Sequence, residues 1–415
     1  MKPEAVLPTR GQFITGGLAA SAATLASVNV IAAPTEALVV GISVPETGPY
    51  SAQGLDQLRA YRMAIAEINK AGGVLGLPIK ASIGDDRTRP ASAVANARRM
   101  IEGERAVMIT GGSSSATAVA VSDLCQEKKV VFMATLTHSN ETTGKSCHYH
   151  TFRRYNNAHM SASALARTMA TKYGAGRWFY ITADYTWGHS VYQSITEVAE
   201  SKGATTIKNV LVPVGSQDFG SAFTQAIAAK PDVLVVTEFG NDMINALYQA
   251  AQFGFTKTTK ILVPLADEYM VVGAQDNFDG VVTTAPFYWK YHAARYPAAK
   301  KFVDAFTKLY GTPPSNGAEC AYTNMFQWKA GVERAGSLDP KTFVAKMEGY
   351  HFSATKDPEY WRAFDHQGIN SVLVLEGIPL AQRTSKFAYA KVLEVHDGDS
   401  VAVKESASDC KLDGA

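Results

Sequence analysis

The sequence lacks the features that mark nucleic-acid partners, metal sites and membrane spans. Its 40 basic and 38 acidic residues leave a formal charge of +2, so we expect no strongly basic surface for nucleic acid. It has only 4 cysteines, and their spacing fits no CxxC zinc or redox motif. Beyond residue 37, no apolar run is long enough to cross a bilayer. We therefore predict a small-molecule partner, no nucleic acid, no metal and no cofactor.

Enzyme signatures are also missing. Gly111-Gly112-Ser113 follows a predicted strand but is not the GxSxG elbow of hydrolases, and no His and Asp lie in the order that such an enzyme needs. Gly174-Ala175-Gly176 precedes a strand instead of following one, unlike a dinucleotide fingerprint. Asp85-Asp86 could imitate a metal loop, but a turn and cap role is favoured. We expect no catalytic residue and no enzyme activity.

Residues 1–37 are predicted to be a cleavable signal peptide. Lys2 and Arg10 are basic, and residues 13–33 are uncharged and rich in small side chains. A membrane anchor is the alternative, but the glycines and polar residues in this stretch make it a weak span. Residues 9–14 resemble a twin-arginine export signal with one arginine missing, so the general secretory and twin-arginine routes both stay open.

Export would allow the cysteines to form disulfides. Cys125 and Cys147 flank one predicted strand and its following loop, which makes them the first expected pair and leaves Cys320 with Cys410 as the second. Four cysteines allow three pairings, and the sequence alone does not choose among them.

From residue 38 the chain alternates apolar strands with amphipathic helices. The run LVVGI predicts a strand, and Leu55, Leu58 and Tyr61 begin the apolar face of the helix that follows. IKASI, AVMIT and VVFMA continue the alternation. This pattern predicts a doubly wound parallel sheet. Loops 45–54, 111–115 and 135–140 would then meet at the carboxyl edge, where such sheets bind ligands.

A second run of the same kind begins near residue 158. Its predicted strands are RWFYI, NVLV, DVLVV and KILV, and from residue 281 the chain adds a short strand, long helices and two late strands near 372 and 389. A composition of 46% hydrophobic and 19% charged residues can bury two sizeable cores. The predicted fold class is α/β, with two doubly wound parallel-sheet lobes that share the tail.

The stretch VMITGGSSSATAVAVSDL, residues 107–124, is the strongest candidate for an anion site. Glycines let the backbone approach a ligand, and the N–H groups at a helix start favour negative charge. Serine hydroxyls add donors. The alternative is that Ser113, Ser114 and Ser115 form only a helix cap and a polar turn.

Several motifs resemble those of type I periplasmic solute-binding proteins of the branched-chain amino-acid (Leu/Ile/Val-binding) family, which serve ABC importers. The motifs are VGISVPETGPYSAQG, AYRMAIAEINKAGGVLG, SSATAVAV, FYITADYTWG and DGVVTTAPFYW. The resemblance implies a periplasmic monomer that hands its solute to a membrane permease. It also implies two lobes joined by a hinge of three crossings, near Arg153, Pro286 and Trp361. Lobe 1 would be 38–152 with 286–360, lobe 2 would be 153–285 with 361–405, and 406–415 would be a tail.

The resemblance also implies a ligand-binding set. Ser115 matches the serine that holds a carboxylate, and His138 is either a cation for that carboxylate or an ordinary loop histidine. Trp187 and Phe239 stand where tyrosines usually face the ligand, with packing in the lobe core as the alternative. Asp267 or Glu268 lies near the position of the glutamate that receives an ammonium. The full predicted set is Tyr50, Gln53, Ser115, Leu136, Thr137, His138, Tyr185, Trp187, Phe239 and Asp267.

The expected function is capture of a small carboxylate, amino acid or amide between closing lobes, followed by delivery to an ABC importer. ADYTWG, APFYW and TGKSC are most similar to a branch of the family associated with amides, urea, and aromatic and organic acids. The identity of the solute stays open. The alternative function is a sensory or regulatory ligand-binding protein that acts with a membrane partner.

Overall fold

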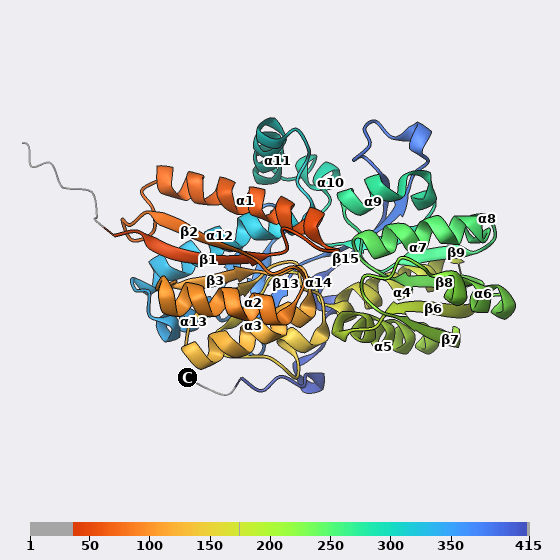
Figure 1. The fold of residues 1–415 in the computed structure, drawn as a ribbon, viewed down its shortest axis with the longest axis horizontal. Helices are drawn as coiled ribbons and strands as arrows, with labels where there is room; N and C mark the ends of the chain where they lie inside the picture. The colour runs from red at the N-terminus through yellow and green to blue at the C-terminus, as the bar shows by residue number, and fades with distance from the viewer. Residues whose placement is uncertain (1–35, 174, 413–415) are drawn as a thin grey trace, which may run out of the picture. The chain divides into compact units, whose positions relative to one another are not determined.

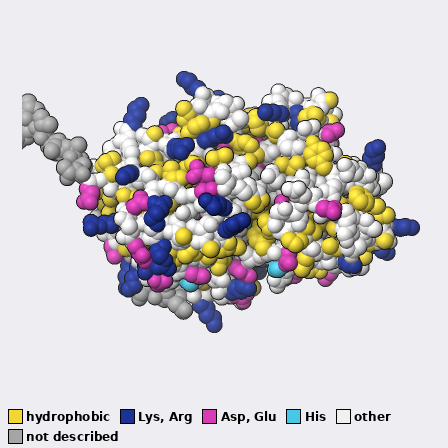
Figure 2. Space-filling model, in the orientation of Figure 1, with side chains coloured by type: hydrophobic (Ala, Val, Ile, Leu, Met, Phe, Trp, Pro, Cys, Tyr) yellow, Lys and Arg dark blue, Asp and Glu magenta, His cyan; other side chains and the backbone are white. Residues whose placement is uncertain are grey.

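The computed structural model describes residues 36–173 and 175–412. Almost all of the predicted signal peptide lies outside these residues. In the described part of the chain, no helix is both long and apolar enough to span a membrane. Basic and acidic side chains are interspersed on the face drawn in Figure 2.

The first sheet has five parallel strands in the order β2-β1-β3-β4-β5. Nearly every residue of its three central strands is buried, as expected for a sheet covered on both faces. The strands are β1 (Leu38–Val44), β2 (Ile79–Asp85), β3 (Met108–Gly111), β4 (Val131–Ala134) and β5 (Thr151–Arg153).

Helices cover both faces of this sheet (Figure 1). One face packs against α1 (Ser51–Lys70), α11 (Pro297–Tyr310), α12 (Asn316–Ala335) and α13 (Pro340–Met347). The other packs against α2 (Pro90–Arg98) and α3 (Ser115–Lys128). Helices from the first and last thirds of the sequence therefore share one apolar core.

The second sheet has seven strands in the order β15-β14-β10-β9-β8-β6-β7. The strands are β6 (Arg177–Ala183), β7 (Thr205–Val212), β8 (Val233–Thr237), β9 (Lys260–Val263), β10 (Val282–Ala285), β14 (Val372–Gly377) and β15 (Ala390–His396). β6 to β10 are parallel, as predicted, but β14 and β15 pair antiparallel. The segment between β14 and β15 contains no long crossover helix, and antiparallel neighbours need none.

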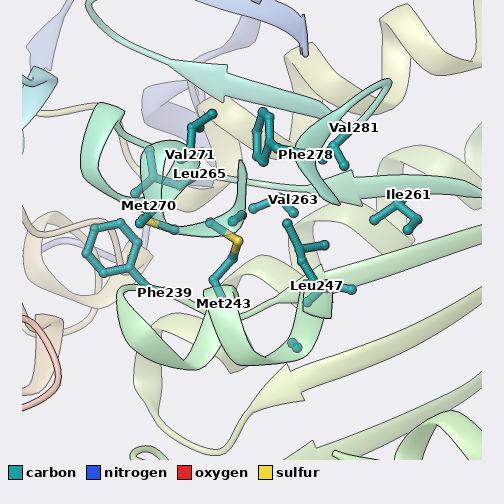
Figure 3. Close-up of a cluster of buried hydrophobic side chains, with 14 of the residues drawn as sticks. Phe239, Met243, Leu247, Ile261, Val263, Leu265, Met270, Val271, Phe278 and Val281 are labelled. Atoms are coloured by element: carbon teal, nitrogen blue, oxygen red, sulfur yellow. The ribbon is translucent and has the colours of Figure 1, made fainter. Parts of the chain in front are cut away.

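Two layers of helices also cover the second sheet (Figure 1). α4 (Ala158–Tyr173), α5 (Thr186–Ser201) and the short α14 (Gly398–Val401) lie on one face. α6 (Gly220–Ala229), α7 (Asn241–Gln252), α8 (Phe255–Thr258) and α9 (Glu268–Ala274) lie on the other. Figure 3 shows this second core, with Phe239 at one end of the cluster beside Met270.

The chain passes between the two sheets three times, after β5, after β10 and after β13. Beside these passages, β11 (His351–Phe352), β12 (Glu359–Trp361) and β13 (Gly368–Ile369) form a small antiparallel sheet. Trp361 packs on Phe152 of the first sheet, with ring centroids 5.4 Å apart. The strands thus favour a third passage after Ile369 over the expected one near Trp361. The exact boundaries of the two lobes stay a prediction.

The expected cysteine pairing is wrong, because the structure contains a Cys147–Cys410 disulfide and leaves Cys125 and Cys320 as buried thiols. Cys125 faces the core between α3 and the first sheet. The Cys320 thiol lies 3.8 Å from the carbonyl oxygen of Thr135. The disulfide joins positions 263 residues apart, so it depends on the return of the C-terminal segment, which no local sequence pattern signals.

Removing this disulfide is expected to lower the free energy of unfolding by about 2 to 4 kcal/mol, because the link restricts the unfolded chain. The measurement is urea denaturation of the wild type and of Cys410→Ser, each with and without reductant. Reductant should destabilise only the wild type. Equal urea midpoints for the oxidised wild type and the variant would contradict the prediction.

Candidate functional site

The predicted ligand loops follow strands that are neighbours in space. In the first sheet the order changes direction between β1 and β3, and the loops after β1, β3 and β4 leave its carboxyl edge together. In the second sheet the order changes direction between β6 and β8. Loops beside such reversal points form the usual ligand crevice of doubly wound sheets.

These loops from the two sheets enclose one small cavity. It is lined by Ser113, Ser115, Leu136 and His138 from the first sheet and by Tyr185, Trp187, Phe239 and Leu265 from the second. Six of the ten predicted residues are in this set. Ser113 and Leu265 are additional, although the serine run and the strand-end position of Leu265 were visible in the sequence. The cavity volume is about 10 Å³, which is room for about one water molecule.

The serine hydroxyls are fixed by hydrogen bonds that leave their own protons free. Ser115 Oγ accepts from the backbone N–H groups of His138, at 3.1 Å, and Ser139, at 2.9 Å. Ser113 Oγ accepts from Gln57 Nε2 at 2.5 Å. Because each oxygen already accepts, each O–H can donate to an anion. Ser114 holds the cap position of α3 but makes no side-chain cap bond, so helix capping does not account for the serine run.

Backbone geometry brings the serine loop close to its neighbours. Gly111 and Gly112 have φ values of +124° and +90°. A Cβ on Gly111 would collide with the carbonyl oxygen of Ser43. A side chain here would force β3 away from β1 and move the serines. Beside this loop, the buried Thr137 hydroxyl has no hydrogen-bond partner among the described residues.

His138 is not the cation that one reading of the sequence suggested. Burial, with a smaller contribution from the positive charge of Arg153, lowers its pKa to about 3. Nδ1 accepts from the indole N–H of Trp187 at 2.7 Å, so the neutral ring carries its proton on Nε2 and donates to Ser161 Oγ at 2.8 Å. His138 therefore orients Trp187 and is neutral at physiological pH.

Aromatic side chains form the opposite wall. Trp187 and Phe239 lie edge to face with ring centroids 6.0 Å apart, and Tyr50 meets Phe239 at 5.2 Å. Trp187 and Phe239 are only 2% and 4% exposed, and both belong to the core of the second sheet. They are thus core residues that also line the cavity. The indole N–H of Trp187 is bonded to His138, which leaves an apolar wall.

Two buried carboxylates follow β9 beside this wall. Asp267 caps α9, with Oδ1 accepting from the Met270 N–H at 2.9 Å, and the side chain of Gln53 lies close enough to this carboxyl group to lower its pKa, although Oδ2 accepts no hydrogen bond of ordinary geometry in the described chain. Neither carboxylate oxygen of Glu268 has a described partner. Burial raises the pKa of Asp267 to about 6 and that of Glu268 well above its usual range. Gln53, the remaining predicted residue, is buried and also has an unpartnered oxygen, Oε1.

Direct hydrogen bonds join the two sides around the cavity. Tyr269 in α9 donates to Asp56 in α1 at 2.7 Å. Ser139, in the loop after β4, lies 3.0 Å from Ser190 of α5, oxygen to oxygen. Asn316 Nδ2 donates to the Ala266 carbonyl at 3.0 Å. The cavity must therefore widen before it can hold a solute larger than water.

A second cavity of about 380 Å³ lies beside the C-terminal segment, lined by residues that include Glu141, His159, Glu197, Arg362 and Asp409. It does not lie between the reversal points of the two sheets. Within the described ranges, no group of three His, Cys, Asp or Glu side chains is arranged to hold a metal.

Comparison with known proteins places the chain in a family. The sequence profile described as periplasmic binding protein matches residues 37–379. The Leu/Ile/Val-binding protein homolog 3 of Brucella melitensis is 24% identical over 332 residues, which cover 79% of this chain and 88% of the relative. A solved periplasmic binding protein from Burkholderia mallei is 24% identical, with a TM-score of 0.85 and coverage of 91% of this chain and 99% of that chain.

A second solved relative is an amino acid ABC transporter substrate-binding protein from Pseudomonas fluorescens. It is 26% identical, with a TM-score of 0.82, and the match covers 91% of this chain and 99% of that chain. These findings confirm the two-lobed α/β fold expected from the sequence. Since the profile spans most of its length, the chain belongs to the periplasmic binding protein family, among relatives named for binding leucine, isoleucine and valine.

Proposed function

We propose that this protein is an extracytoplasmic receptor that encloses an amino acid between its two lobes and delivers it to a membrane ABC importer, and that it is not an enzyme. The observation that supports this most is the shared cavity, which joins hydroxyl donors from one sheet to an apolar wall from the other. Relatives named as ABC transporter substrate-binding proteins support the importer as partner.

The polarity of the site suggests how the solute is oriented. Ser113 and Ser115 can donate to a carboxylate, and the N-terminal end of α3 adds favourable potential there. Asp267 and Glu268 are buried acceptors that an ammonium group could satisfy. Burying an unpaired charge is costly, so these carboxylates favour an amine-bearing solute over a simple acid or amide.

The experiment for this proposal follows the melting temperature of the purified protein with a library of amino acids, amides and organic acids. Binding to the folded state alone raises the melting temperature. An increase without product formation is the expected result. If no compound in the library raised the melting temperature, or if one were converted, the receptor proposal would fail. Co-purification separates the importer role from the sensory alternative. A permease that co-purifies with the protein would support the importer role, and a membrane sensor protein would support the alternative.

Ser113→Ala is expected to weaken binding of the identified solute by about 1 to 3 kcal/mol, because a hydrogen bond to a charged group is lost. Ser115→Ala should have at least this effect, since its oxygen also holds the backbone N–H groups of His138 and Ser139. Calorimetric titration measures both. Ser122→Ala is the control, because Ser122 lies in α3 with Ser115 but its buried hydroxyl bonds to Thr151 in β5 instead of facing the cavity. Equal affinities for Ser113→Ala and the control would exclude Ser113 as a carboxylate holder.

A further inference from the structure

Glu238 is a buried carboxylate without a partner in the described chain. It directly follows β8 and precedes Phe239 of the cavity wall. The side chain is 0% exposed, neither oxygen accepts a hydrogen bond, and no ion pair joins it to a described lysine or arginine. Burying an unpaired carboxylate is far more costly than burying a neutral polar group. Without a partner such a group is held neutral, so a cationic donor from outside the chain would be needed to keep Glu238 charged beside the ligand cleft.

Among the described residues, the surroundings of Glu238 contain acceptors and hydroxyls, and no lysine or arginine forms an ion pair with it. Asp242, in the first turn of α7, raises the pKa of Glu238 further beyond the effect of burial. Tyr50 and Tyr185 border the aromatic wall with their hydroxyl oxygens 3.4 Å apart. Burial raises the pKa of Tyr185, and the charge of Glu238 raises it further. Glu238 therefore lies near the Tyr50–Tyr185 pair and directly before Phe239 in the sequence, next to the residues that line the cavity but not among them.

The two orphaned acidic positions are neighbours along one sheet edge. Glu238 follows β8, Asp267 and Glu268 follow β9, and these two strands are paired. An α-ammonium that donates to Asp267 or Glu268 leaves the carboxyl group of Glu238 available to a second donor of the solute. The apolar wall of Trp187 and Phe239 can pack against the methylene groups of a long side chain.

We propose that Glu238 is a specificity-determining residue that receives a second nitrogen of the solute, so that the solute is an amino acid with a basic side chain. This inference rests on the proposed function. In this arrangement the α-carboxylate meets Ser113 and Ser115, and the α-ammonium meets Asp267 or Glu268. The side-chain methylenes lie along the aromatic wall, and the terminal ammonium or guanidinium donates to Glu238.

The test is calorimetric titration with two matched probes, L-lysine and L-norleucine, which differ by the terminal ammonium. L-arginine provides a second basic probe. We expect the wild type to bind L-lysine at least tenfold more tightly than L-norleucine. Glu238→Gln should abolish this preference while its affinity for L-norleucine stays within twofold. Glu200→Gln, an exposed change on α5, is the matched control and should keep the preference.

Two results would overturn the inference. One is equal or tighter binding of L-norleucine by the wild type, which leaves the receptor function intact and removes only the role of Glu238. The other is an equal loss for both probes in Glu238→Gln, which would show that Glu238 only supports the fold. If Glu238→Gln does not fold, the comparison of probes in the wild type still decides. If neither probe nor any other compound binds, the proposed function itself fails.

Discussion

Replacing Arg154 with methionine is expected to lower the free energy of unfolding by about 3 to 5 kcal/mol, because it removes the cation that hydrogen-bonds to two buried carboxylates and leaves only Lys356 near them. Arg154 donates to Glu319 at 2.8 Å and to Glu359 at 2.6 Å, and all three side chains are no more than 1% exposed. These residues lie where the chain passes from the first sheet to the second. Urea denaturation of the wild type and the variant measures the loss.

The same network predicts a pH dependence. Burial alone would raise the pKa of Glu319, but the charges of Arg154 and Lys356 lower it from 4.5 to about 2. A depressed pKa in the folded state stabilises the protein above the ordinary value of 4.5. This contribution is lost as the pH falls from 4.5 towards about 2.

A control separates charge from packing at this network. Adding Glu319→Gln and Glu359→Gln to Arg154→Met should recover part of the lost stability, because no unpaired carboxylate is left buried. In the triple variant, the free energy of unfolding should also no longer show the decrease at acidic pH that Glu319 contributes. If the urea midpoint of Arg154→Met equalled that of the wild type, the buried network would be irrelevant to stability.

A disulfide across the cleft is expected to abolish rapid solute binding. The hydroxyl oxygens of Ser139 and Ser190 are 3.0 Å apart and belong to the two sides of the cavity. We expect cysteines at these two positions to lie close enough to form a disulfide. The cavity they would hold shut is about 10 Å³, too small for any amino acid. The oxidised variant should bind at least about 100-fold more slowly than its reduced form.

Stopped-flow measurement of binding to Ser139→Cys/Ser190→Cys, before and after reduction, tests this expectation. The wild type treated in the same way is the control, since reductant also opens Cys147–Cys410. Unchanged association in a variant shown to be fully cross-linked would mean that solute enters without separation of the lobes.

Most of the fold could be predicted from local patterns in the sequence. Apolar runs such as LVVGI mark strands because both faces of a covered parallel sheet are apolar, and Gly111-Gly112 marks a loop because of its positive φ values. From these local features the strands, their loops and six of the cavity residues could be predicted.

The features that could not be predicted depend on partners far apart in the sequence. Cys410 returns to Cys147 across 263 residues. The neutrality of His138 results from burial and from a hydrogen bond with Trp187, 49 residues away. The antiparallel pairing of β14 also depends on its neighbour β10 and not on its own composition, which is that of any buried strand.

The central claim is that the solute lies in the cavity between the serine loop and the aromatic wall. A crystal structure of the protein with the solute identified by thermal shift tests this most directly. We predict solute density between Ser113 or Ser115 on one side and Trp187 or Phe239 on the other, in a cavity wider than about 10 Å³. Density in the 380 Å³ cavity beside the C-terminal segment, with the serine loop unoccupied, would contradict the account.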